Sequence, residues 1–150
     1  MADTVTPEMR SRNMSAIRSK DTKPEVYLRK LLFAEGLRYR KNDSRIYGHP
    51  DLFFPKYRAA VFIHGCFWHR HPGCRYSYHP KSRQDYWEPK FSRNILRDAE
   101  VKEHLAADGI RQLIVWECTV KEMKKDSARR NEVLGEIIKF LKSESRYLEL

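Results

Sequence analysis

Long apolar segments are missing from this sequence of 150 residues. The longest uninterrupted apolar run has five residues, at positions 59–63, whereas a membrane-spanning helix needs about 18. The N-terminus also lacks the apolar stretch of a secretory signal peptide. We therefore expect a soluble, cytoplasmic protein with no membrane partner. Internal repeats and low-complexity tracts are absent as well, and the length predicts a single domain.

Cysteine is scarce, with only Cys66, Cys74 and Cys118 in the chain. An odd number of cysteines without a secretion signal argues against a disulfide scaffold. Metal ligation and simple burial remain as the two alternatives. Because all three cysteines can be used together in one site, the spacing favours metal ligation.

The ligands of that site include a histidine as well as the cysteines. His71 lies between Cys66 and Cys74, and Cys118 follows a strand of buried type. Three cysteines and one histidine suit tetrahedral zinc, because soft thiolates select zinc over magnesium. His69 and His79 are alternatives to His71. A structural zinc contributes roughly 10–16 kcal/mol in finger peptides, enough to order the irregular segment at residues 65–90.

Negative charge is in deficit, since 30 Lys and Arg face 20 Asp and Glu, for a formal net charge of +10. Cationic side chains release counterions from a phosphate backbone, so the balance favours a polyanion such as DNA. A merely soluble basic surface is the alternative. We predict that residues 1–20 form a DNA-contacting arm and that residues 21–150 form the folded domain. The arm's DNA-binding residues are expected to be Arg10, Arg12, Arg18 and Lys20.

The hydrophobic pattern predicts a mixed α/β fold. Helices are expected between Thr22 and Gly36, over residues 91–107 and over residues 127–142, from start and stop signals and apolar spacing. Strands are expected in the segment 37–64 and at residues 112–116. The resulting order is helix, three strands, helix, strand, helix, which predicts a mixed central sheet flanked by helices.

Two of these strands place candidate catalytic groups next to each other. If Phe54 pairs with Ala59 across a four-residue loop, Asp51 pairs with Phe62 and has His64 as its diagonal neighbour on the same face. A register change of one residue would separate them. A carboxylate that holds Mg²⁺, with an imidazole beside it, suits phosphodiester hydrolysis.

A second pair and a set of aromatics complete the candidate site. His69 with Asp98 is a candidate dyad, because a carboxylate can fix one tautomer of an imidazole. Taken singly, Asp98 is more simply interpreted as a surface charge on a helix, and His64 as a histidine of the core. Phe67, Trp68 and Trp87 lie in polar surroundings. They can act as wedges between base pairs, or they can cover the metal-binding loop.

Several ordered motifs resemble the very-short-patch repair (Vsr) family of DNA mismatch endonucleases. The strongest is FIHGCFWHRH at residues 62–71, and the others are RNMSAI at 12–17, GHPD at 48–51 and VWEC at 115–118. Asp21, Thr22 and Glu25, and further on Trp87, Lys90, Asn94, Arg97 and Asp98, fall in the family's order. The likeness covers residues 8–120.

This resemblance implies an Mg²⁺-dependent endonuclease with a restriction-endonuclease-like fold. Such an enzyme nicks double-stranded DNA 5′ of the thymine in a T·G mismatch that arises from deaminated 5-methylcytosine, acts as a monomer and hands the nick to repair proteins. The implied roles are Mg²⁺ binding by Asp51 and the Ile63 carbonyl, hydrolysis by His64 and His69 with Asp98, and holding of metal-bound water by Glu25. Zinc goes to Cys66, His71, Cys74 and Cys118. The wedge is Phe67, Trp68 and Trp87.

Two features depart from the expected pattern. Ile63 stands where a Thr-like residue is expected, which is harmless if only the backbone carbonyl binds metal. Pro72 and Gly73 change the spacing of the zinc loop slightly. The acid and lysine of generic restriction enzymes are replaced by Phe62 and His64, which disfavours that wider class.

A non-catalytic zinc-stabilised DNA-binding module and a nuclease without mismatch specificity are the competing functions.

Overall fold

A five-stranded mixed sheet forms the centre of the molecule in the computed structural model, which describes residues 21–150. The strands lie side by side in chain order: β1 (Arg40–Lys41), β2 (Leu52–Phe54), β3 (Ala59–His64), β4 (Arg111–Trp116) and β5 (Tyr147–Glu149). The β1–β2 and β2–β3 pairs are antiparallel, whereas β3–β4 and β4–β5 are parallel. The predicted α/β class with a mixed sheet is thereby confirmed.

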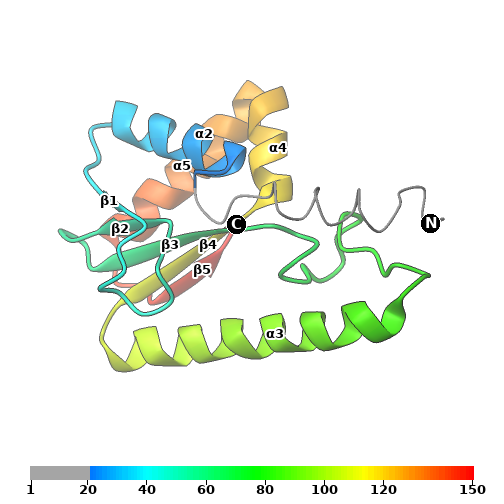
Figure 1. The fold of residues 1–150 in the computed structure, drawn as a ribbon. Helices are drawn as coiled ribbons and strands as arrows, with labels where there is room; N and C mark the ends of the chain where they lie inside the picture. Colours follow the sequence, from blue (N-terminus) through cyan, green and yellow to red (C-terminus); the bar gives the residue numbers. More distant parts are fainter. Residues whose placement is uncertain (1–20) are drawn as a thin grey trace.

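Helices cover both faces of this sheet (Figure 1). The long helix α3 (Gln84–Ala107) runs along one face, and α2 (Lys23–Ala34), α4 (Glu117–Lys125) and α5 (Ser127–Lys142) lie on the other. Side chains of β3 and β4 alternate between two buried clusters. Val61, Leu113 and Val115 pack with residues of α2, α4 and α5, whereas Phe62 and Trp116 pack with α3. Strands buried on both faces are expected to be mostly apolar, and here the polar residues stand only at the strand ends, with His64 closing β3 and Arg111 and Gln112 opening β4.

The β2–β3 hairpin has the register that the sequence predicts. Phe54 pairs with Ala59 and Leu52 with Val61, so the ladder extended by one step sets Asp51 opposite Phe62. The turn between the strands contains Arg58, whose φ is +47°. The register matters because it sets the face of the sheet on which the carboxylate of Asp51 lies and the β3 residue that it faces.

Several predicted boundaries were wrong. Helix α3 begins at Gln84, not at residue 91, and contains Pro89. Proline here removes one backbone N–H near the start of the helix without preventing the helix from forming. Helix α4 and strand β5 were not predicted at all. In the segment 37–64, Ile46 and Tyr47 lie in turns, and the first strand is only Arg40–Lys41.

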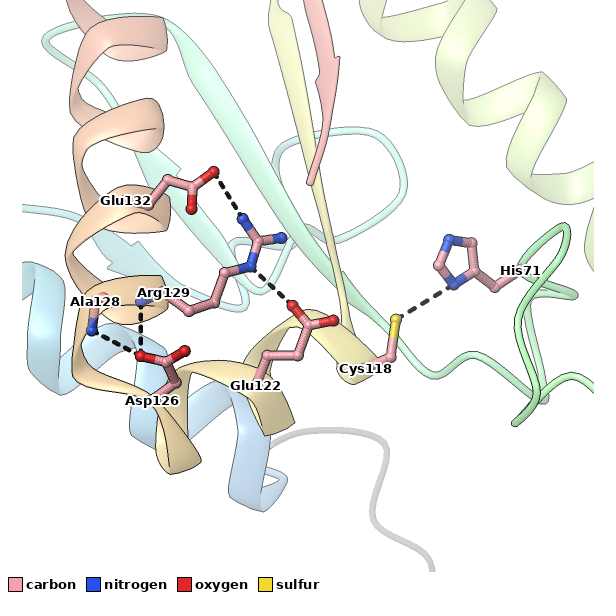
Figure 2. Close-up of polar contacts among 7 residues, drawn as sticks. All are labelled: His71, Cys118, Glu122, Asp126, Ala128, Arg129 and Glu132. Atoms are coloured by element: carbon pink, nitrogen blue, oxygen red, sulfur yellow. Dashed lines mark hydrogen bonds and ion pairs between the residues drawn. The ribbon is translucent and has the colours of Figure 1, made fainter.

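The two helices after β4 are joined through a well-capped turn (Figure 2). The side chain of Asp126 accepts hydrogen bonds from the backbone N–H groups of Ala128 and Arg129, at 2.9 and 3.3 Å. Arg129 Nε lies 2.7 Å from Glu122 Oε2. A side-chain oxygen at the N-cap satisfies otherwise unpaired N–H groups. The turn therefore holds α4 against α5 and fixes the direction in which α4 leaves the sheet.

Candidate functional site

The predicted catalytic residues meet in one cavity of about 450 Å³ at an edge of the sheet, which we call the catalytic cavity after this prediction. This edge receives the carboxyl ends of the parallel strands β3 and β4 and the residue before β2. The cavity is lined by all five predicted catalytic side chains and by Ile63: Glu25, Asp51, Ile63, His64, His69 and Asp98. The structure therefore brings together groups that come from α2, the β2–β3 hairpin, the following loop and α3.

The carboxylates of Asp51 and Glu25 form the acidic part of the cavity. Asp51 Oδ2 accepts a hydrogen bond of 2.7 Å from the backbone N–H of Ile63. Glu25 is buried, and its Oε2 accepts a hydrogen bond of 3.0 Å from the backbone N–H of Asp21. Burial, together with the nearby charge of Glu25, raises the pKa of Asp51 to about 8. Two neighbouring carboxylates, one buried and one half-buried, fit a hard divalent cation, whose charge would offset their repulsion.

The two imidazoles lie face to face beside these carboxylates. The ring centroids of His64 and His69 are 3.8 Å apart and the ring planes differ by 5°. His64 is 6% exposed, and its Nδ1 has no hydrogen-bond partner among the described residues. Burial, with the charge of His69 as a smaller cause, lowers the pKa of His64 to about 3. His64 is therefore a neutral ring at neutral pH.

His69 has the carboxylate partner that the sequence predicts. Its Nδ1 lies 2.8 Å from Asp98 Oδ2, and both side chains are about one-third or less exposed. A neutral His69 in this contact carries its proton on Nδ1, which leaves Nε2 as the acceptor. The pair can consequently orient one imidazole and accept a proton at a defined atom.

The three cysteines and His71 form a second cluster, next to the catalytic cavity. Potential ligand atoms of Cys66, His71, Cys74 and Cys118 all lie within 4.8 Å of one another. Figure 2 shows His71 Nδ1 facing Cys118 Sγ, at 3.5 Å. Burial raises the pKa of the Cys66 thiol to about 12 and also raises that of Cys118. The donor set fits a bound zinc ion, because a coordinated cation stabilises thiolates that burial alone disfavours.

The structure distinguishes among the three candidate histidines for this cluster. His71 lies with the cysteines. His69 belongs to the catalytic cavity through Asp98. His79 is exposed and lies 3.7 Å from Glu88. The loop also folds tightly, since the backbone N–H groups of His71 and Cys74 donate to the carbonyls of Cys66 and His71, respectively.

The predicted wedge residues form one aromatic cluster between the loop and the start of α3. The ring of Phe67 lies 5.3 Å from the rings of Trp68, Trp87 and Phe91. Trp68 lines the catalytic cavity and also an adjoining surface hollow that contains Lys90. Phe67, Trp68 and Trp87 are half-buried and pack on one another, and Trp68 borders both the predicted catalytic groups and the basic hollow.

Two residues near the site were given no role from the sequence, although both belong to the motif VWEC at 115–118. Glu117 lines the catalytic cavity as a further carboxylate, and Trp116 lies between His64 and His71. Both come at the carboxyl end of β4. The parallel pairing of β4 with β3 was the signal that could have found them, because parallel strands end at the same edge of a sheet.

Other parts of the molecule lie apart from this site. The larger cavity, of about 870 Å³, is at the opposite end of β4 and includes none of the predicted site residues. The predicted arm with Arg10, Arg12, Arg18 and Lys20 lies outside the described residues. Within residues 21–150, none of the helices has the length and apolar character that crossing a membrane requires.

Sequence comparisons relate this chain to DNA endonucleases. The family model described as DNA mismatch endonuclease Vsr matches residues 2–75. The chain is 44% identical over 137 residues to the type II nicking enzyme V.NmeAIP of Neisseria meningitidis, which is 91% of this chain and 97% of that protein. It is 43% identical over 134 residues to the type II nicking enzyme V.XorIIP of Xanthomonas oryzae, covering 89% and 98%. It is 40% identical over 125 residues to the DNA mismatch endonuclease Vsr of Escherichia coli, covering 83% and 80%.

Proposed function

The chain belongs to the Vsr family of DNA mismatch endonucleases, and from this premise we propose that it nicks duplex DNA 5′ of the thymine in a T·G mismatch. It is a DNA-cleaving hydrolase, as its relatives are. The nick would begin the repair of a deaminated 5-methylcytosine. We further propose that the fold is restriction-endonuclease-like, that the enzyme acts as a monomer and that repair proteins take over the nicked DNA.

One observation carries the proposal: a carboxylate pair and an oriented imidazole share a single cavity. Asp51 and Glu25 supply oxygen ligands, and His69 is held at Nδ1 by Asp98. Hydrolysis of a phosphodiester needs charge stabilisation at the phosphate and a group that accepts a proton. The cavity contains residues suited to each task.

Mg²⁺ fits the acidic part of the cavity. In this proposal Asp51 and the backbone carbonyl of Ile63 hold the ion, and Glu25 holds a water molecule bound to it. The ion would supply charge stabilisation for the attacked phosphate and the leaving oxygen. Because a backbone carbonyl makes no demand on its side chain, isoleucine at position 63 is compatible with this role.

The protein's own groups would move and hold the proton. We assign Nε2 of His69 as the acceptor of a proton from the attacking water, because its Nδ1 faces Asp98 Oδ2. Asp98 would stabilise the imidazolium that results. His64, neutral and stacked on His69, would keep the ring in place and help to exclude bulk water.

The remaining predicted residues would recognise and grip the substrate. Phe67, Trp68 and Trp87 form the candidate wedge, and a mismatched step opens at lower cost than a paired one. Cys66, His71, Cys74 and Cys118 would bind a structural zinc that fixes the loop carrying two of these aromatics. The basic residues of the N-terminal segment, Arg10, Arg12, Arg18 and Lys20, would contact the phosphate backbone.

A strand-nicking assay tests this function. The substrates are a T·G duplex and the matched duplex, each labelled separately on both strands, with Mg²⁺ or with EDTA. We expect Mg²⁺-dependent nicking of the thymine strand only. Asp51→Ala should abolish nicking while leaving DNA binding largely intact. Equal cutting of the matched duplex would indicate a nuclease without mismatch specificity. Binding without any cutting would indicate a non-catalytic DNA-binding module.

A further inference from the structure

The indole of Trp116 contacts both the catalytic cluster and the cysteine cluster. Trp116 ends β4 and pairs with His64 in the parallel ladder. Its ring is stacked on His71, with centroids 4.1 Å apart and planes 5° apart. Its edge meets the ring of His64, with centroids 5.3 Å apart and planes at 74°. Trp116 is 6% exposed, and its buried ring touches both groups of residues.

Packing has a special importance for His64. The Nδ1 atom of this ring has no hydrogen-bond partner among residues 21–150. The rings of Phe62, His69 and Trp116 surround it instead, at centroid distances of 5.9, 3.8 and 5.3 Å. Because no hydrogen bond at Nδ1 sets the plane of the imidazole, its neighbours' rings must do so. The orientation of Trp116 therefore affects His64 directly and affects His69 through the stack.

The orientation of Trp116 is in turn set by the last strand. Trp116 Nε1 donates a hydrogen bond of 2.9 Å to Glu149 Oε1. The other carboxylate oxygen, Oε2, accepts a hydrogen bond of 2.7 Å from the hydroxyl of Tyr147. The backbone N–H of Trp116 also donates to the carbonyl of Leu150, at 2.9 Å. Both oxygens of Glu149 are thus used, although Glu149 is the exposed residue of the edge strand β5.

We infer that Glu149 and Trp116 are positioning residues for strand hydrolysis. The carboxylate of Glu149 fixes the indole, and the indole fixes the stacked pair His64–His69 on one side and His71 on the other. This inference rests on the proposed function, because it concerns the rate of the same reaction. It adds a role for the C-terminal strand, which lies far along the chain from the residues that would touch DNA.

The first test compares Glu149→Ala with Glu144→Ala. Glu144 is an exposed carboxylate between α5 and β5, so its removal changes the net charge equally. We expect Glu149→Ala to lower kcat for T·G nicking about fivefold, the factor that corresponds to one ordinary hydrogen bond, with KM unchanged. Glu149→Gln retains an oxygen acceptor and should restore most of the rate. Equal kcat values for the Glu149→Ala and Glu144→Ala variants would overturn the inference.

A double-mutant cycle asks whether Glu149 acts through Trp116. In a Trp116→Phe background the indole N–H is gone, so Glu149→Ala should cause no further fall in kcat. An undiminished fivefold effect in that background would overturn the inference. Circular dichroism melts of all variants verify that they fold. If Trp116→Phe failed to fold, the comparison of Glu149→Ala with Glu149→Gln would still test whether Glu149 is a positioning residue.

An NMR measurement separates this inference from the proposed function. The indole ¹H–¹⁵N signal of Trp116 and the ring signals of His64 and His69 can be followed without DNA. Glu149→Ala should shift all three, whereas Glu144→Ala should leave them in place. If the wild type failed to nick a T·G duplex, the proposed function would fail while these shifts still tested the contact. Unchanged His64 and His69 signals in Glu149→Ala would contradict the positioning role.

Discussion

The imidazole rings of His64 and His69 are stacked with their centroids 3.8 Å apart. Two protonated rings at this distance would repel strongly, so one of the pair has to stay neutral. Burial lowers the pKa of His64 to about 3, and the carboxylate of Asp98 lies beside His69. In the proposed mechanism the two rings therefore have separate tasks, with His64 as the neutral ring and His69 as the ring that takes up a proton.

This division predicts a large effect of Asp98→Asn. The amide keeps the size of the side chain but no longer stabilises a protonated His69, so kcat for T·G nicking should fall about 10²- to 10⁴-fold. DNA affinity in a gel-shift assay should change little. Glu103→Gln removes an exposed carboxylate from the same helix and serves as the control. A rate for Asp98→Asn equal to that of the control would contradict the dyad.

The buried neutral His64 also predicts a pH dependence of stability. The unfolded chain binds a proton on this residue below about pH 6.5, whereas the folded chain does so only near pH 3. The contribution of neutral His64 to the free energy of unfolding is therefore fully present above about pH 6.5 and is lost as the pH falls toward 3. Between pH 7 and pH 5, urea titrations should show wild type losing about 2 kcal/mol more unfolding free energy than His64→Asn. His79→Asn, which alters an exposed histidine, should behave like wild type.

Removal of the Asp51 charge should abolish activity without lowering the stability of the metal-free protein. In the metal-free protein, burial and Glu25 raise the pKa of Asp51 to about 8, so stability is lost as the pH rises toward 8. Asp51→Asn removes this cost and should melt at the same or a higher temperature at pH 8 without metal. It should not nick DNA, and Mg²⁺ should raise the melting temperature of wild type alone. A Mg²⁺-dependent increase in the variant would argue that Asp51 is not a ligand.

The cysteine cluster predicts one zinc per chain by elemental analysis. Cys118→Ser should lose the metal and melt at a much lower temperature, because structural zinc contributes strongly to folding. His71→Ala should weaken zinc binding, whereas His79→Ala should leave it intact, since only His71 lies with the cysteines. A folded, zinc-free wild-type protein would refute the assignment.

The aromatic cluster predicts a loss of discrimination when its rings are removed. Stacking on a base contributes about 1–3 kcal/mol, so Trp87→Ala should lower kcat/KM on a T·G duplex about 10- to 100-fold. Tyr57→Ala removes an aromatic side chain that lines the distant larger cavity and provides the comparison. The result is measured as the ratio of nicking rates on T·G and matched duplexes. An unchanged ratio in Trp87→Ala would mean that the ring only covers the loop.

The β2–β3 hairpin could be predicted because a short turn and an apolar pattern left few registers. Other elements gave weaker signals. The first turns of α3 contain Pro89 within a polar, aromatic stretch, which obscured the helix. Helix α4 follows β4 without any intervening residue, so no loop marked its start. Strand β5 has only three residues, too few for a period to be recognised.

In the candidate site, too, some contacts could be predicted from the sequence and others could not. Asp51 and His64 lie at the ends of one hairpin, so their common edge follows from a single register, and His69 follows His64 after a short loop. The contact between Trp116 and Glu149 joins residues 33 positions apart. It depends on how β5 docks beside β4, which is decided by tertiary packing and not by any local pattern. Contacts of that kind are the ones that a single sequence conceals.

Only Gly65 separates His64 from Cys66, so the proposed hydrolytic groups and the cysteine cluster are directly connected along the chain. An insertion or deletion at Gly65 would change the position of His64 relative to Cys66, so it would disturb both clusters at once. Grafting these groups onto the sheet of another protein would require transfer of residues 62–74 as one intact segment. Laboratory evolution of altered mismatch preference should accordingly accept substitutions in this segment far more readily than changes in its length.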